Sequence, residues 1–142
     1  MDTGIKVGDC MKTELVTIMD DASVFEAAER MTKNDVGCLV VTNSRGKIYA
    51  LLTDEDLVRK VLSKRKLDAA VKDVASKPLI GLGPESDLTD AARLMGQKRV
   101  KRLVVFAGRD GHDVVGLISA RDIVDLSPSL YDLIAERERI RA

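Results

Sequence analysis

A stretch of sequence that occurs twice is the strongest constraint on how this chain folds. When the chain is shifted by 64 positions, residues 7–41 align with residues 71–105, and ten of these 35 pairs are identical. Two extra residues near 108–112 then change the shift to 66, and the similarity continues from 50–57 to 116–123. Because a copy of about 60 residues is too short to bury a large core alone, we expect the two copies to pack on each other.

Each copy has the same order of apolar runs, helical patterns and turns. Ser23 and Asp87 are predicted to cap the first helix of each copy, and Thr53 and Ser119 precede the second helix. The predicted strands are 15–18, 38–42 and 48–52 in the first copy, and 79–82, 103–106 and 114–118 in the second. The predicted fold is therefore α/β, with two tandem β-α-β-β-α repeats packed sheet to sheet about a pseudo-two-fold axis.

The repeat also predicts how the chain is divided. The expected segments are a first repeat at 1–66, a linker at 67–70, a second repeat at 71–126 and a C-terminal helix within 127–142. Ser127 is predicted to cap this last helix, with Pro128 at its first position. Its apolar stripe consists of Leu130, Leu133 and Ile134. We expect the stripe to cover the module or to contact a second subunit.

Composition excludes several classes of function. Lys and Arg total 23 and are balanced by 23 Asp and Glu, and aromatic residues are only 3%, which disfavours a nucleic-acid or membrane-surface binder. One histidine, His112, and the distant cysteines Cys10 and Cys38 provide no pattern for a zinc site, a disulfide framework or a Ser–His relay. Without a membrane-length apolar run or an apolar signal core, we expect a cytoplasmic protein.

The junction between the last strand and the second helix carries the same polar pattern in both copies. Thr53 is followed by Asp56, and Ser119 by Asp122, at the same spacing. This spacing is typical of a capping box, in which each side chain binds a backbone N–H of the other residue. A carboxylate can also accept hydrogen bonds from both hydroxyls of a ribose. Both interpretations stay open, and the occurrence of the pattern twice favours a functional role.

The chain resembles a tandem pair of CBS domains, also called a Bateman module. The resemblance rests on segments 7–11, 34–41 and 98–105 and on the two junctions, and it covers residues 5–126. It implies a non-catalytic regulatory module that binds adenine nucleotides (AMP, ADP or ATP) or S-adenosyl compounds in the clefts between the repeats. It also implies a homodimer that signals in trans to an effector protein.

The same resemblance implies which residues bind the ligand. The aspartates of the junctions would hold the ribose hydroxyls, and the threonine and serine would contact ribose or phosphate. One predicted site consists of Asp122, Ser119, Leu15, Val16, Val36 and Gly37. The other consists of Asp56, Thr53, Leu79, Ile80, Val100 and Lys101. The candidate phosphate-binding cations are Lys101, Arg102 and Arg121.

The two predicted sites differ in charge. Lys101 aligns with the uncharged Gly37, and Asp54 and Glu55 add acidic groups beside Asp56. Because these carboxylates repel phosphate, we expect the sites to differ in phosphate affinity. A bridging Mg²⁺ is an open alternative at the acidic site, and the residues indicate no other metal or cofactor.

Other functions are weaker alternatives. The main one is a structural protein-interaction module with vestigial nucleotide sites, which would show no thermal shift with any nucleotide. Nucleic-acid binding through the basic stretches 59–66 and 98–102 is disfavoured by the zero net charge. We do not expect an enzyme, since nothing completes a catalytic site around Asp56 or Asp122.

Overall fold

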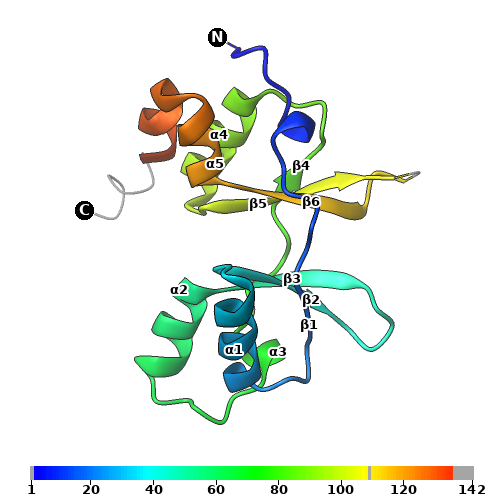
Figure 1. Cartoon of the computed structure of the whole chain (residues 1–142), viewed down its shortest axis with the longest axis vertical. Helices are drawn as coiled ribbons and strands as arrows, with labels where there is room; N and C mark the ends of the chain where they lie inside the picture. The colour runs from blue at the N-terminus through cyan, green and yellow to red at the C-terminus, as the bar shows by residue number, and fades with distance from the viewer. Residues whose placement is uncertain (1, 109, 136–142) are drawn as a thin grey trace. The chain divides into compact units, whose positions relative to one another are not determined.

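The computed structural model describes residues 2–108 and 110–135 and divides the chain into two compact units (Figure 1). The first unit is Leu15–Leu79, and the second joins Met1–Glu14 to Ile80–Ala142. The first unit contains β1 (Thr17–Met19), α1 (Val24–Asn34), β2 (Cys38–Thr42), β3 (Ile48–Thr53), α2 (Asp54–Asp56), the π-helix η2 (Leu57–Leu62) and α3 (Val71–Val74). The second contains the 3-10 helix η1 (Val7–Asp9), β4 (Gly81–Leu82), α4 (Leu88–Lys98), β5 (Arg102–Ala107), β6 (Asp113–Ser119), α5 (Ala120–Leu126) and the 3-10 turn η3 (Pro128–Leu130).

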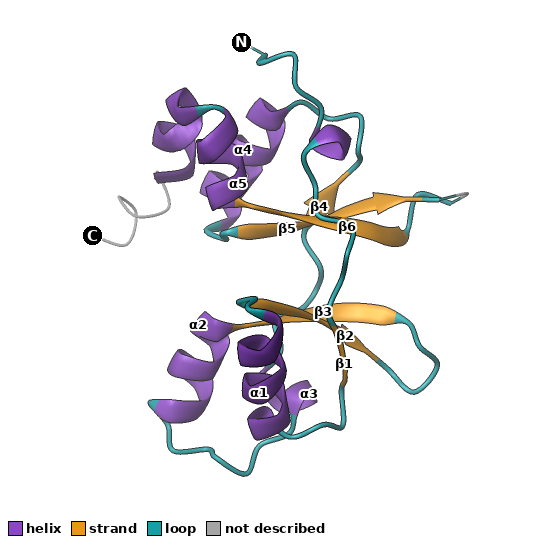
Figure 2. Cartoon of the chain, in the orientation of Figure 1, coloured by secondary structure: helices purple, strands orange, loops and turns teal. Residues whose placement is uncertain are grey.

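Each unit has one three-stranded sheet, in the order β1-β2-β3 or β4-β5-β6. In both sheets the first pair of strands is parallel and the second pair is antiparallel. Both antiparallel pairs change register at the same place in the repeat, after Val41 and after Val105. In each unit the helices lie on one face of the sheet (Figure 2). The predicted order β-α-β-β-α is therefore confirmed in both copies.

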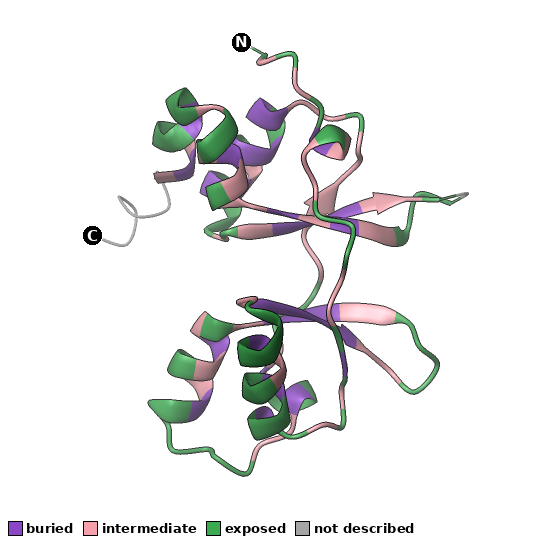
Figure 3. Cartoon of the chain, in the orientation of Figure 1, coloured by how far each residue is buried: buried purple, intermediate pink, exposed green. Residues whose placement is uncertain are grey.

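The core consists of one apolar cluster in each unit (Figure 3). In α1 the positions facing the sheet are buried, while Phe25 on the other side is exposed, as the helical period requires. Matching positions of the repeat are buried in both clusters: Ala27 and Ala91, Met31 and Met95, Leu39 and Leu103, Val41 and Val105. Each fully buried Leu, Val or Met contributes roughly 1.5–3 kcal/mol, so the repeated pattern specifies both cores.

The opening segment of each sequence repeat packs outside the unit that holds the rest of that repeat. Val7 is buried in the cluster of the second unit, and Val71 in that of the first. The backbone of Lys12 makes a pair of hydrogen bonds with Leu117 (2.8 and 3.0 Å). Ser76 pairs in the same way with Leu51, at 2.8 and 3.1 Å. The packing units thus differ from the sequence segments 1–66 and 71–126, because each opening segment extends a sheet of the other copy.

The C-terminal segment follows its predicted pattern only in part. Ser127 takes the N-cap position of η3 as predicted, but with φ −145° and ψ 80° its side chain makes no capping hydrogen bond. Pro128 opens the turn η3 as predicted, and residues 131–135 are helical. Leu130 and Ile134 are buried in the cluster of the second unit, with Leu133 packed against it. This part of the segment therefore covers its own unit, and residues 136–142 of the predicted helix lie outside the described residues.

Asp87 caps α4 and also holds the N-terminal segment. Its carboxylate accepts hydrogen bonds from the backbone N–H groups of Thr89 (2.8 Å), Thr3 (3.0 Å) and Gly4 (2.8 Å). Burial alone would raise the pKa of Asp87, but the hydrogen bonds donated by Thr3 and Thr89 outweigh burial and hold the pKa well below its usual value.

We expect Asp87→Asn to lower the free energy of unfolding by about 1–2 kcal/mol at pH 7. Because the pKa of Asp87 is lower in the folded than in the unfolded state, its contribution is present above about pH 4 and is lost as the pH falls further. Urea denaturation at pH 7 and at about pH 2.5 should therefore show the gap between wild type and variant narrowing in acid. Glu85→Gln, on an exposed neighbour, is the control. A gap of equal size at both pH values would contradict this role of Asp87.

Candidate functional site

The two junctions form closed capping boxes at matching places in the units. Asp56 N–H donates to Thr53 Oγ1 (3.1 Å), and Thr53 N–H donates to Asp56 Oδ2 (3.0 Å). Ser119 and Asp122 make the same two hydrogen bonds, both at 3.1 Å. The capping interpretation of both motifs is thus confirmed, and ribose binding by the two aspartates stays a prediction.

Two other predicted site residues, Gly37 and Lys101, are joined to these junctions by backbone hydrogen bonds. The carbonyl oxygen of Gly37 accepts the N–H of Asp54 at 2.9 Å, and that of Lys101 accepts the N–H of Ala120 at 2.7 Å. The residues before β2 and β5 are therefore held at the start of the helix that follows the sheet. In the same unit as Asp56 lie Leu15, Val16, Val36, Gly37, Thr53 and Leu79, and in that of Asp122 lie Ile80, Val100, Lys101, Arg102, Ser119 and Arg121. The predicted combination of residues from both repeats in one site stays a prediction.

The first strands contribute through their backbone. The carbonyl oxygens of Val16 and Ile80 accept hydrogen bonds from Val40 and Val104, at 2.9 and 3.0 Å. The side chains of both residues are half-buried, as are those of Leu15 and Leu79. These residues therefore have a structural role at the edge of each sheet, and part of each side chain remains accessible.

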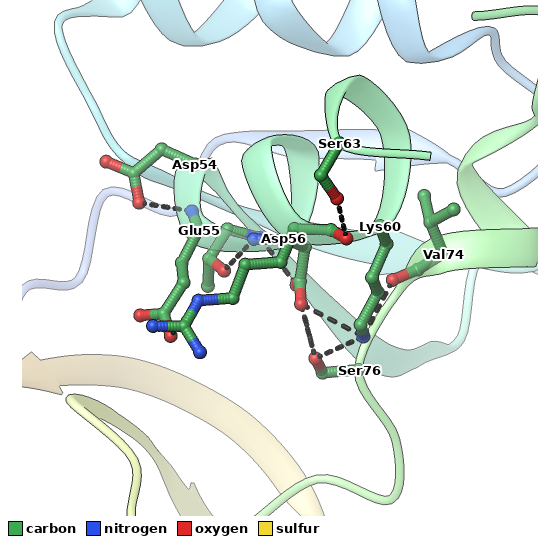
Figure 4. Close-up of polar contacts among 9 residues, drawn as sticks. Asp54, Glu55, Asp56, Lys60, Ser63, Val74 and Ser76 are labelled. Atoms are coloured by element: carbon green, nitrogen blue, oxygen red, sulfur yellow. Dashed lines mark hydrogen bonds and ion pairs between the residues drawn. The ribbon is translucent and has the colours of Figure 1, made fainter. Parts of the chain in front are cut away.

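The carboxylate oxygens of Asp56 accept hydrogen bonds from several residues of its own unit (Figure 4). Ser76 Oγ donates to Oδ1 at 2.9 Å and lies 3.2 Å from Oδ2. Lys60 Nζ lies 3.0 Å from Oδ1 and also donates to the carbonyl of Val74 (3.1 Å) and to Ser76 Oγ (3.2 Å). Together with the Thr53 N–H, these groups leave the Asp56 side chain only 9% exposed. The network ties the helical segment after β3 to the segment that follows α3.

Asp122 occupies the same position of the repeat but is more open. Its side chain is 20% exposed, and Lys12 Nζ lies 3.8 Å from Oδ1, which is too long for a hydrogen bond. Oδ2 accepts the N–H of Ser119 within the capping box. Among the described residues these are the polar contacts of the Asp122 carboxylate, so Oδ1 has capacity to accept further hydrogen bonds.

The repeat explains why the two aspartates differ. The shift of 64 aligns Lys12 with Ser76, and the shift of 66 aligns Lys60 with Leu126. Each aspartate therefore has one lysine, but from a different element, and the hydroxyl of Ser76 has no counterpart at Asp122. Sequence reasoning missed Lys12, Lys60 and Ser76. The alignment with Lys12 and the spacing of four residues from Asp56 to Lys60 were the signals that could have identified them.

The surroundings of the junctions also differ in charge. Beside Asp122 the second unit places Lys12, Lys101 and Arg121, and all three are exposed. The matching positions in the first unit are Ser76, Gly37 and Glu55. The second unit thus has cations at three positions of the repeat where the first unit has none, and of these Lys12 contacts the Asp122 carboxylate. The sequence analysis assigned Lys101 to the site of Asp56, and both this assignment and the expected difference in phosphate affinity stay predictions.

Burial raises the pKa of the Cys10 thiol, and the negative charges of Asp9 and Asp122 raise it further. Cys10 is therefore a neutral thiol at pH 7, and it packs against the apolar cluster of the second unit. Within 2–108 and 110–135, no three His, Cys, Asp or Glu residues come together as a metal site. None of the described helices is long and apolar enough to cross a membrane.

Comparisons with known proteins agree with the repeat. The CBS domain model matches residues 7–63 and again residues 71–129. A CBS domain-containing protein of Bacillus subtilis, YhcV, is 30% identical over 118 residues, which cover 82% of this chain and 81% of that protein.

Two solved structures have the same fold. A CBS domain protein of unknown function from Thermoplasma acidophilum superposes with a TM-score of 0.84 at 22% identity, over 94% of this chain and 76% of that one. The CBS domain pair of protein MJ0100, in complex with 5′-methylthioadenosine and S-adenosyl-L-methionine, has a TM-score of 0.77 at 22% identity, over 87% of this chain and 96% of that one. The family model matches most of the chain in two consecutive copies, so this chain belongs to the CBS domain family and is a tandem pair of CBS domains.

Proposed function

We propose that this CBS pair is a non-catalytic regulatory module that binds an adenosine nucleotide through the carboxylate of Asp122. The observation that carries the proposal is the open Oδ1 of Asp122, whose nearest cation, Lys12, is 3.8 Å away. The two hydroxyls of a ribose are donors that match a carboxylate with spare acceptor capacity. The adenosine compounds in the MJ0100 complex support this class of ligand.

The charge around Asp122 supports a ligand that carries phosphate. Lys12, Lys101 and Arg121 are exposed cations on the segments next to Asp122, and a bound phosphate requires such partners because an unpaired anion is costly to desolvate. AMP, ADP or ATP therefore fit better than S-adenosyl compounds, which remain the alternative ligands. No metal is required in this proposal, since side chains provide the positive charge.

Regulation follows from a competition for Asp122. A ribose that binds Oδ1 replaces Lys12, and Lys12 belongs to the N-terminal segment that pairs with β6. Because the ligand binds one arrangement of this segment better than another, it shifts the population toward that arrangement. A homodimer and an effector protein in trans complete the proposal and rest on the family resemblance. We also propose a cytoplasmic location.

The proposal is tested by thermal shift and isothermal titration with AMP, ADP, ATP, S-adenosylmethionine and adenosine. A ligand at 100 times its Kd stabilises the folded state by about 2.7 kcal/mol, which raises Tm visibly. We expect Asp122→Ala to weaken nucleotide binding by roughly 10–100-fold, because hydrogen bonds to a charged group are worth about 1.5–3 kcal/mol. Asp125→Ala, an exposed aspartate on the same helix, should leave binding unchanged.

Two results would overturn this assignment. If Asp122→Ala binds nucleotide as tightly as wild type, the carboxylate does not hold the ribose. If no adenosine compound raises Tm, the chain is better described as a structural interaction module with vestigial sites. The filled carboxylate of Asp56, which offers a ligand little acceptor capacity, is the observation that favours this second function.

A further inference from the structure

The second unit contains a pocket between α5 and the helical residues 131–135, which Figure 1 shows beside α5. Its volume is about 290 Å³. The residues that line it come from the position before β5, from α5 and from this last segment, and they are chiefly Lys101, Arg121, Val124, Asp125, Tyr131 and Ile134. All of them belong to one unit, so the pocket is defined by the second unit alone.

The pocket depends on a segment outside the CBS repeat. Tyr131 and Ile134 follow the second match to the CBS domain model, which ends at residue 129. On α5 the shift of 66 aligns Arg121 with Glu55, so the first copy has the opposite charge at this position. The pocket is therefore not a feature that the two copies share, and its ligand has to be identified from its own lining.

One wall of the pocket is apolar. Ile134 is 7% exposed and lies in the apolar cluster of the unit, and Val124 packs against that cluster. Tyr131 is 57% exposed, so part of its ring is free to contact a ligand. Aromatic rings pack against aliphatic groups and pair with one another in offset or edge-to-face arrangements. This wall therefore fits the ring of an aromatic ligand.

Two cations and one carboxylate also line the pocket. Lys101, Arg121 and Asp125 are exposed, and none of them forms an ion pair within the part of the chain that the structure describes. The Ala120 N–H donates to the carbonyl of Lys101 at 2.7 Å, which keeps the backbone of Lys101 next to Arg121. Lysine and arginine bind carboxylates through charge-assisted hydrogen bonds. Because Asp125 reduces the charge of the lining to a single positive charge, a monoanion fits this pocket better than a polyphosphate.

We propose that this pocket binds a small aromatic carboxylate, a class of ligand distinct from the nucleotide. The ring packs against Val124, Ile134 and Tyr131, and the carboxylate binds Arg121 and Lys101. Pockets for small ligands have volumes of about 300–1,000 Å³, so a pocket of about 290 Å³ accommodates one ring with a short acidic side chain. The proposal does not rest on ribose binding, because the described lining does not include the aspartate of the capping box.

The test measures binding of benzoate, phenylacetate and hydrocinnamate to the full chain. Nucleotide is left out, since Lys101 and Arg121 are also the cations proposed for a phosphate. We expect isothermal titration to give saturable binding of at least one carboxylate with a Kd of about 1 mM, as is usual for so small a ligand. In two-dimensional NMR the shift changes should centre on residues 120–125 and 131–135. Benzyl alcohol, which has the ring without the charge, and acetate, which has the charge without the ring, should bind roughly tenfold more weakly.

Arg121→Gln and Tyr131→Ala, both at exposed residues, should each weaken binding of the carboxylate by roughly five- to tenfold. Arg93→Gln, at an exposed arginine of α4 outside the pocket lining, is the matched control and should leave binding unchanged. Absence of saturable binding by all three carboxylates would overturn the proposal, and so would binding that neither variant weakens. Asp122→Ala should bind the carboxylate as wild type does, so this proposal and the proposed nucleotide site can fail independently of each other.

Discussion

Asp56→Ala should lower the free energy of unfolding by about 3 kcal/mol, because it removes the centre of a buried polar network. Without the carboxylate, the Thr53 N–H loses its partner and Ser76 Oγ loses both of its contacts to Asp56. Lys60 is 42% exposed and keeps the Val74 carbonyl, so it contributes less to the loss than a buried lysine would. Urea denaturation of the full chain gives the difference directly.

The repeat provides a matched control for this prediction. Asp122→Ala removes the same residue type from the same capping box, but with one longer contact, to Lys12. We therefore expect a loss of about 1 kcal/mol, typical of a capping residue. Equal losses for Asp56→Ala and Asp122→Ala would contradict the difference between the two networks.

The difference between the hydrogen bonds of Asp56 and Asp122 also affects which aspartate can bind a ligand. A carboxylate whose oxygens are already bonded within the fold has little capacity left for the two hydroxyls of a ribose, whereas Asp122 has an open oxygen. We propose that one repeat uses its aspartate mainly for stability and that the other uses it for ligand binding. Two copies of one motif can diverge in this way because the capping box is kept in both.

Local patterns predicted most of the fold. The strand at 38–42 and the helices after Ser23 and Asp87 were predicted correctly, because capping residues and apolar periods act over a few residues. The first strands, predicted at 15–18 and 79–82, are shorter. At Val16 the backbone pairs with β2 through its carbonyl, but the regular strand begins only at Thr17.

What the sequence could not predict depends on contacts between distant segments. Nothing local to Val7 or Val71 indicates which apolar cluster each will join, since both are simply apolar. Lys12 reaches Asp122 only because its segment pairs with Leu117. Ser127 had the right residue type for a cap, but its backbone is held at ψ 80°, outside the extended conformation found at the other caps.

The N-terminal segment also packs closely against β6, where Met11 lies over Gly116. A β carbon added at Gly116 would lie 2.6 Å from Met11 Sδ and 3.0 Å from the carbonyl oxygen of Lys12. In the first unit Ala75 stands at the position of Met11, and Ala50 stands at the position of Gly116. The residue on the segment is therefore smaller than in the second unit, and the residue on the strand is larger. The alignment of the repeat thus replaces methionine with a smaller residue where glycine is replaced with a larger one.

We expect Gly116→Ala to lower the free energy of unfolding by about 1–3 kcal/mol through overpacking. In the variant that combines it with Met11→Ala, which recreates the alanine pair of the first unit, the loss should be smaller than the sum of the single losses by about 1 kcal/mol. A double-mutant cycle by urea denaturation measures this coupling, and additive losses would contradict it. Because Met11 precedes Lys12, overpacking here also displaces the lysine that faces Asp122. Nucleotide affinity should therefore fall in Gly116→Ala and recover in the double variant. This recovery distinguishes displacement of Lys12 from loss of the Asp122 carboxylate itself.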